Sequence, residues 1–212
     1  MRLKIIVAVV AGIAIGAAAC HKKPPKGEAA DLTASPTATE EFQMGKGKRK
    51  CPDDMAWVEP AMVCIDLYEF PNMSGELPLV GLTYGQAEEL CKSYGKRLPT
   101  AKEWELACGG EKNFPYPYGE TYKKDTCWMD RPYSAGPTIS GSMPQCVSPF
   151  GIYDMTGNVW EWTSSDGFEP GTKYVRGGSW LSYPSVATCT LMAWEKPESG
   201  GKDYGFRCAL KP

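Results

Sequence analysis

Two acidic residues stand in a stretch of the sequence that is suited to binding a metal ion. Asp154 and Glu161 lie in the run FGIYDMTGNVWEW, residues 150–162. Gly157, between them, permits a backbone turn that few other residues adopt, so that neighbouring carbonyl oxygens can point inward. Carboxylate and carbonyl oxygens are the ligands that calcium prefers. The run therefore predicts a calcium-binding loop; the alternative is a packed loop whose carboxylates bond main-chain amides.

The sequence argues against nucleophilic and imidazole-dependent catalysis. Its one histidine, His21, precedes the region that is expected to fold. Without an imidazole, neither a Ser-His-Asp nor a Cys-His arrangement can form, so Ser179 and Ser182 lack the usual base. A histidine-liganded iron site is excluded for the same reason. We therefore predict no catalytic residue.

Two helices and a strand are expected to position the loop. The helices span residues 83–95 and 100–109, and each begins with a capping-box pattern and ends at a glycine. The capping pairs are Thr83 with Gln86 and Thr100 with Glu103, and the glycines are Gly95 and Gly109. Residues 62–71 alternate between apolar and polar types, which is typical of a strand. Together with many glycines and prolines, this predicts an irregular, loop-rich α+β domain.

The first residues of the sequence indicate export. Residues 1–19 combine basic residues, an apolar run and small residues at its end, which is typical of a signal peptide. Cys20 then follows three alanines, a pattern similar to a bacterial lipidation site. We expect a lipid anchor on Cys20 and a place in the bacterial cell envelope, with the outer membrane favoured. The alternatives are an ordinary signal peptide or an uncleaved anchor.

Residues 20–50 read as a flexible tether. They are rich in Lys, Pro, Ala and Thr, and too few of them are apolar to offset the entropy lost on folding. The basic run 46–50 is interpreted as a solvated linker end, with contact to anionic lipid or cell wall as the alternative. A formal net charge of −2 predicts no nucleic-acid partner. One domain, residues 51–212, remains.

The cysteines indicate disulfides. Of the 9 cysteines, Cys20 is assigned to the lipid, and an exported domain can oxidise the other eight. Eight cysteines allow 105 pairings, so the sequence does not choose among them. A zinc site is the competing interpretation, but no CxxC spacing occurs.

Four sequence motifs resemble one known family. Phe150–Trp162, VRGGSW at Val175–Trp180, GFRCA at Gly205–Ala209 and KRLPTAKEWELAC at Lys96–Cys108 are similar to the formylglycine-generating enzyme family, also called the sulfatase-modifying-factor domain. The resemblance covers roughly Met55 to Leu210. It implies a C-type-lectin-like fold.

The resemblance also implies a disulfide pattern. Matching cysteines of the family pair as Cys91–Cys208 and Cys108–Cys189. The remaining four cysteines then pair most simply as neighbours, giving Cys51–Cys64 and Cys127–Cys146. The domain is therefore expected to be braced by four disulfides.

For metals, the resemblance implies one site and argues against another. It assigns calcium to four residues of the loop, by side chain or by carbonyl: Asp154, Gly157, Val159 and Glu161. The family's oxidase chemistry uses two cysteines that hold copper, but Ser182 and about Ala187 stand at their positions. A serine hydroxyl does not replace a thiolate as a copper(I) ligand. Copper and the oxidase activity are therefore not expected.

Three functions remain open. We favour a non-catalytic lipoprotein that uses its calcium-stabilised domain as a scaffold to bind an envelope protein, peptide or glycan. The second is an enzyme of the same superfamily, either the formylglycine-generating type or a divergent maturation enzyme, with Glu195 and Asp203 in its cleft. The third is a structural component of the envelope.

Overall fold

The computed structural model describes residues 51–212. The expected signal peptide, the Cys20 lipidation site and the tether lie outside the described residues. Within residues 51–212, no helix is long and apolar enough to cross a membrane.

Both predicted helices are present, and their capping boxes set where they begin. Helix α1 covers Tyr84–Ser93 and helix α2 covers Ala101–Gly109. The side chains of Thr83 and Thr100 accept hydrogen bonds from main-chain N–H groups of the first turn. In turn, the side chains of Gln86 and Glu103 accept hydrogen bonds from the main-chain N–H groups of Thr83 and Thr100. Gly95 ends α1 in the left-handed conformation, with φ of 69°. Helix α2 includes Gly109, and Gly110 takes the capping position instead.

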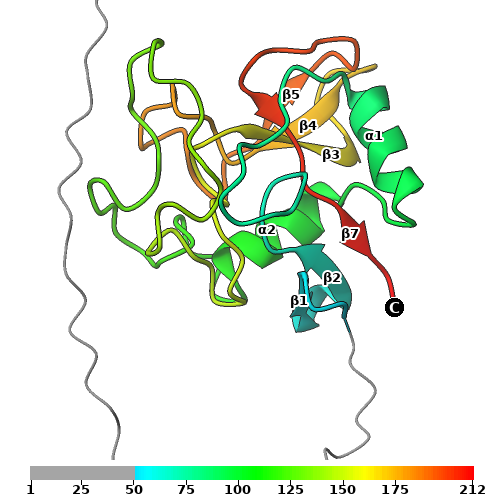
Figure 1. Ribbon diagram of the computed structural model, residues 1–212, viewed down its shortest axis with the longest axis horizontal. Coiled ribbons are helices and arrows are strands. Elements are labelled where there is room, and N and C mark those ends of the chain that lie inside the picture. Colours follow the sequence, from blue (N-terminus) through cyan, green and yellow to red (C-terminus); the bar gives the residue numbers. More distant parts are fainter. Residues whose placement is uncertain (1–50) are drawn as a thin grey trace, which may run out of the picture. The chain divides into compact units, whose positions relative to one another are not determined.

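The strands form two small sheets (Figure 1). The first has the antiparallel order β1-β2-β7, with β1 at Met55–Val58, β2 at Val63–Asp66 and β7 at Ala209–Leu210; a 3-10 turn, Glu59–Ala61, joins its first two strands. The second has the order β5-β4-β3-β6, from Ala193–Glu195, Lys173–Arg176, Trp160–Asp166 and Tyr204–Gly205. Strands β3 and β6 run parallel, and the other pairs are antiparallel.

The predicted strand over residues 62–71 is shorter than expected. Strand β2 ends at Asp66, after which the chain turns back. The Asn72 side chain accepts a hydrogen bond from the Tyr68 N–H and donates to the Asp54 carbonyl, which fixes this turn. Apolar alternation continued past Asp66, but the turn removes those residues from the sheet.

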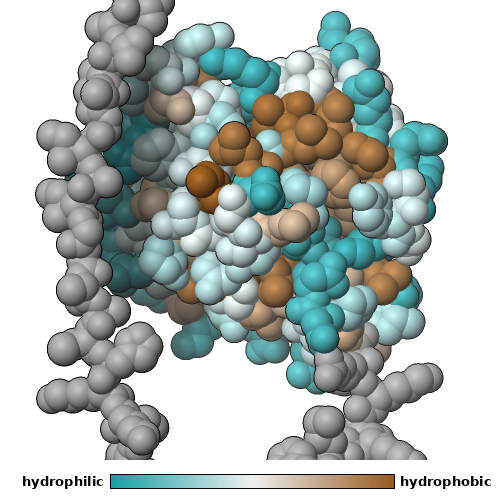
Figure 2. Space-filling model, in the orientation of Figure 1, coloured by the Kyte–Doolittle hydropathy of each residue, from teal (hydrophilic) through white to brown (hydrophobic). Residues whose placement is uncertain are grey.

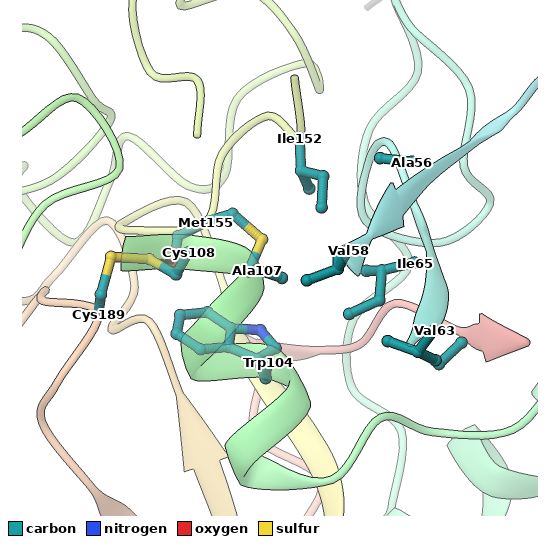
Figure 3. Close-up of a cluster of buried hydrophobic side chains, with 11 residues drawn as sticks. Ala56, Val58, Val63, Ile65, Trp104, Ala107, Cys108, Ile152, Met155 and Cys189 are labelled. Carbon is teal, nitrogen blue, oxygen red and sulfur yellow. Dashed lines mark hydrogen bonds between the residues drawn. A yellow bond between two sulfur atoms is a disulfide. The ribbon is translucent and has the colours of Figure 1, made fainter. Parts of the chain in front are cut away.

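Helix α2 packs between the two sheets. Trp104, Ala107 and Cys108 on its buried face contact a cluster with Val58 and Ile65 of the first sheet (Figure 3). A second cluster joins α1 to the other sheet through apolar residues that include Cys91, Trp162, Val175 and Phe206. The loop 150–162 enters the first cluster through Ile152 and Met155. Its position is therefore tied to the core.

Four disulfides brace the domain, in the pairing expected above. They are Cys51–Cys64, Cys91–Cys208, Cys108–Cys189 and Cys127–Cys146. Two of them close long loops, of 117 and 81 residues, and tie α1 and α2 to the C-terminal part of the domain. Closing a long loop restricts the unfolded chain most in the chain-entropy account. All eight cysteines of residues 51–212 are thereby oxidised.

Candidate functional site

Main-chain hydrogen bonds and left-handed residues shape the loop 150–162. Asp154 and Asn158 have φ of 56° and 53°, and Gly157 has φ of 79°. At Gly157 a side chain would not fit, since a Cβ atom would lie 2.5 Å from the Trp128 carbonyl oxygen. The Gly157 N–H donates to the Gly177 carbonyl at 2.9 Å. The expectation that Gly157 is needed for the turn is therefore met in the structure.

Asp154 is buried with one oxygen unused. Only 1% of the residue is exposed. Its Oδ2 accepts a hydrogen bond of 2.7 Å from the Gly141 N–H, whereas Oδ1 is buried and has no hydrogen-bond partner among residues 51–212. Burial, together with the charge of Glu161, raises the pKa of Asp154 to about 6 against the effects of Gly141 and Arg207. An unsatisfied buried carboxylate oxygen is costly and calls for an explanation.

Glu161 is held by protein donors. Arg207 donates from Nε to Oε2 and from Nη2 to Oε1, both at 2.7 Å, and the Trp104 indole N–H donates to Oε2 at 2.7 Å. All three side chains are buried. Oε2 therefore has two donors and Oε1 has one, which leaves Oε1 able to accept a further bond or a metal.

A third buried carboxylate, Glu69, was not singled out from the sequence. Its Oε1 accepts from the Asn158 amide at 2.9 Å and its Oε2 from the Ser140 hydroxyl at 2.8 Å. Burial, and then the charge of Asp154, raises the pKa of Glu69 to about 8. An acidic residue inside the apolar run 62–71 was the only signal in the sequence.

The oxygens of the loop suit a hard cation. Besides Asp154 Oδ1 and Glu161 Oε1, the carbonyls of Gly157 and Val159 receive no hydrogen bond from any N–H group of residues 51–212. Calcium takes six to eight oxygen ligands and commonly includes carbonyls and waters. Residues 51–212 contain no group of three or more His, Cys, Asp or Glu side chains able to hold a metal by themselves. A cation here would therefore depend on main-chain oxygens as well.

The two positions expected to correspond to the family's thiols lie next to each other. A Cβ atom on Gly178 would lie 2.9 Å from the Ala187 Cβ and 3.1 Å from the Ser182 Cβ. Gly178, with φ of 76°, is thus required to let both side chains approach its backbone. The Ser182 hydroxyl oxygen accepts a hydrogen bond from the Ser179 N–H at 3.0 Å, and Ala187 is fully buried. Neither residue carries a thiol.

The two carboxylates suggested for a catalytic cleft have structural partners. Glu195 accepts hydrogen bonds from the Ser199 hydroxyl and, at 3.4 Å, from the Tyr204 hydroxyl. Asp203 accepts from the Ser179 hydroxyl at 3.0 Å. Burial, followed by the charges of Glu195 and Asp203, raises the pKa of Tyr204 to about 12. Tyr204 is therefore near both carboxylates but poorly suited to acid–base work at neutral pH.

Exposed aromatic residues lie beside the Ser182 segment. The Asp130 N–H donates to the Ser182 carbonyl at 3.0 Å, which joins the segment 128–136 to the segment 180–187. Each segment carries a highly exposed tyrosine: Tyr133 is 70% exposed and Tyr183 is 69% exposed. The Lys202 ammonium lies 2.7 Å from the centroid of the Tyr133 ring. We call Tyr133, Tyr183 and Lys202 the tyrosine surface.

Apolar side chains are also exposed elsewhere on the domain. Figure 2 shows them gathered on the upper part of one face, over the region where β3, β4, β5 and α1 lie in Figure 1. Trp194 of β5 is 39% exposed, and its ring lies 5.5 Å from that of Phe168, which is 77% exposed. This pair provides a comparison for the tyrosine surface.

Comparison with known proteins identifies relatives. The sulfatase-modifying factor enzyme 1-like domain matches residues 41–212. The "Inactive C-alpha-formylglycine-generating enzyme 2" of Bos taurus is 34% identical over 151 residues, which cover 63% of this chain and 50% of the relative. The chain therefore spans about half the length of this relative.

Two solved structures share the fold. PvdO from Pseudomonas aeruginosa has a TM-score of 0.57 at 20% identity, covering 69% of this chain and 79% of that one. The Major Tropism Determinant U1 variant has a TM-score of 0.55 at 16% identity, covering 76% of this chain and 53% of that one. The loop-rich, disulfide-braced, C-type-lectin-like fold expected from the sequence is confirmed.

Proposed function

The chain belongs to the sulfatase-modifying factor enzyme 1-like domain family, and on that premise we propose that it is an exported lipoprotein whose domain is a non-catalytic, calcium-stabilised binding scaffold. Its anchor would be a lipid on Cys20, and its place the bacterial cell envelope, with the outer membrane favoured. Its partner would be an envelope protein, peptide or glycan.

One observation carries the non-catalytic part of the proposal. Every cysteine of residues 51–212 is in a disulfide, and Ser182 and Ala187 flank Gly178 where the family's thiol pair is expected. Thiolates are the ligands that copper(I) selects, and the reactive species in exchange with a substrate thiol. A hydroxyl and a methyl group supply neither. The relative whose printed name calls it inactive agrees with this proposal.

The calcium part rests on the oxygens of the loop. Asp154 Oδ1, the Gly157 and Val159 carbonyls and Glu161 Oε1 would hold the ion, which would supply positive charge next to buried carboxylates. The unpartnered Oδ1 supports this assignment most directly. The chain's own residues prepare the site, because Gly141 fixes Asp154 Oδ2 and Arg207 fixes Glu161.

The tyrosine surface is the proposed contact with the partner. Tyrosine presents an apolar ring and a polar edge with few rotatable bonds, and it is enriched in binding surfaces. Lys202 adds a cation at the edge of this surface. The absence of an overall positive charge is consistent with a partner other than nucleic acid.

Crosslinking and capture on the full lipidated chain in envelope membranes tests the proposal. Wild type should retain a defined partner without turning it over, and the double variant Tyr133→Ala, Tyr183→Ala should lose it. The matched control is Phe168→Ala, Trp194→Ala, which removes exposed aromatic surface elsewhere and should retain the partner. Equal capture by both double variants would remove the tyrosine surface from the proposal.

The alternative is an enzyme with altered chemistry. It has less support, because Glu195 and Asp203 are occupied by hydrogen bonds to their neighbours. Oxygen consumption with a cysteine-containing sulfatase peptide, lost in Glu195→Gln or Asp203→Asn, would favour this alternative over the scaffold.

A further inference from the structure

The candidate calcium loop is surrounded by more buried negative charge than positive charge. Glu69, Asp154 and Glu161 are each at most 1% exposed, and burial, followed by the charges of Asp154 and Glu161, raises the pKa of Glu69. Burial lowers the pKa of Arg207, but the charges of Glu161, Glu69 and Asp154 raise it overall. Its Nε and Nη2 donate to Glu161, and its remaining bonds go to the carbonyls of Asp66 and Tyr153. Within residues 51–212, Glu69 and Asp154 thus have no cationic side chain bonded to them.

Another buried acid nearby is compensated in a different way. Asp66 forms an ion pair of 2.7 Å with Lys96 and accepts from the Cys208 N–H. Asp66 therefore does not add to the unbalanced charge. When both are ionised, Glu69 and Asp154 form an excess of two negative charges, which is the charge that a divalent ion would balance.

Glu69 lies outside the loop 150–162 but is hydrogen-bonded to it. Its two oxygens accept from Asn158 and Ser140. Asn158 lies between Gly157 and Val159 in the sequence, and its own oxygen accepts from the Thr138 N–H at 2.8 Å. Glu69 is thus bonded to the residue between the two carbonyls.

We propose that Glu69 is a positioning and charge-supplying residue for the Asp154 site, contributing the second negative charge that makes the site select a divalent ion. This inference rests on the calcium site proposed above. Charges interact strongly where water is excluded, so a carboxylate beyond the ligand shell still affects affinity. Without the ion, the folded state must either bury this charge or hold a proton on Glu69, and either is a cost to the folded state.

The test is calcium chloride titration of the full chain by calorimetry, with melting measured in parallel at neutral pH. Glu69→Gln removes the charge and keeps both hydrogen bonds, because the Ser140 hydroxyl can accept instead of donate. It should weaken calcium binding by about tenfold or more. It should also raise the melting temperature of the calcium-free protein, which a merely structural role for Glu69 would not do.

Ser140→Ala is the matched control. It removes a hydrogen bond to Glu69 and keeps the charge, so calcium affinity should stay within about twofold. If both variants weaken calcium equally, Glu69 acts through geometry alone and the charge proposal is overturned. If wild type binds calcium and Glu69→Gln binds it as tightly, the inference fails while the calcium site stands.

Two other outcomes are covered: wild type does not bind calcium, or Glu69→Gln does not fold. If wild type binds no calcium, the proposed calcium site fails first, and the inference fails with it. If Glu69→Gln does not fold, wild type is titrated with calcium at low and high potassium chloride. Potassium should not displace calcium from a site with two unbalanced charges, and simple competition by potassium would overturn the inference.

Discussion

Arg207 donates two hydrogen bonds of 2.7 Å to Glu161, and both side chains are buried. Arg207 comes from the GFRCA motif and Glu161 from the start of β3, 46 residues earlier. The pair links the candidate calcium loop to the segment that carries β6, Cys208 and β7. Loss of one partner would leave buried charge with nothing to balance it.

Replacing Arg207 with methionine should therefore destabilise the domain strongly. We expect a loss of about 3–5 kcal/mol in the free energy of unfolding, measured by chemical denaturation with the disulfides intact. Arg97→Met is the control, because its pair with Glu103 is 38% exposed on the arginine side and should be worth less than about 1 kcal/mol. Similar losses in the two variants would contradict the special role of Arg207.

Calcium should raise the melting temperature of the wild-type domain. A ligand that binds only the folded state stabilises it in proportion to the logarithm of its concentration. Asp154→Ala should abolish the response to calcium, whatever its own starting stability. Asp166→Ala, whose side chain is 88% exposed in wild type, should respond like wild type. A chelator without effect on wild type would exclude the site.

The stability of the calcium-free domain should fall as the pH rises. The pKa of Glu69 is about 8 in the folded state and ordinarily 4.5, so between these values the folded state keeps a proton that the unfolded state has released. The contribution of Glu69 to stability is then full below about pH 4.5 and falls by up to about 1.4 kcal/mol per pH unit until pH 8. The pKa of Asp154, raised to about 6, makes stability fall with rising pH in the same way, over a lower pH range.

Denaturation midpoints at several pH values, measured with chelator present, check this dependence. Glu69→Gln should flatten the fall between pH 6 and 8, where Glu69 is the main contributor. Glu103→Gln is a useful contrast, since the pKa of Glu103 is lowered against burial mainly by Arg97 and its removal should not flatten that range. If stability falls just as steeply between pH 6 and 8 in Glu69→Gln, the pH dependence arises from other groups.

Introducing two thiols at positions 182 and 187 should create a copper site. The double variant Ser182→Cys, Ala187→Cys places both sulfurs around Gly178, and soft thiolates favour copper(I). It should compete with a copper(I) indicator, whereas wild type and Ser182→Cys alone should compete only weakly. Tight copper binding by wild type would show that a thiol is available and would reopen the oxidase interpretation.

Local sequence signals predicted the helices well. The capping boxes at Thr83 and Thr100 depend on residues three positions apart, so the sequence contains all that is needed to place them. The strand predicted from the alternation over residues 62–71 was too long, because the alternation continues past the turn that Asn72 fixes. The disulfide pairing came from family resemblance and could not be derived from the spacing of the cysteines.

Long-range charge pairing could not be predicted in this way. Asp154 and Glu161 were predicted from the sequence as calcium ligands, and both are buried in the structure, but the sequence could not show that Arg207 binds Glu161. Glu69 lies 89 residues from Asn158, its hydrogen-bond partner. Such a contact exists only once loops from different parts of the chain meet. The charge balance of the site is therefore a property of the fold rather than of any motif.

The last strands of the domain close structures that were begun much earlier. Strand β7 pairs with β2, Cys208 joins Cys91, and Arg207 reaches Glu161. A growing polypeptide thus lacks the third strand of its first sheet, and the arginine that pairs with Glu161, until residues 204–210 have been made. The complete fold of this domain therefore requires nearly all of the chain, and until then apolar surface of its earlier segments remains uncovered.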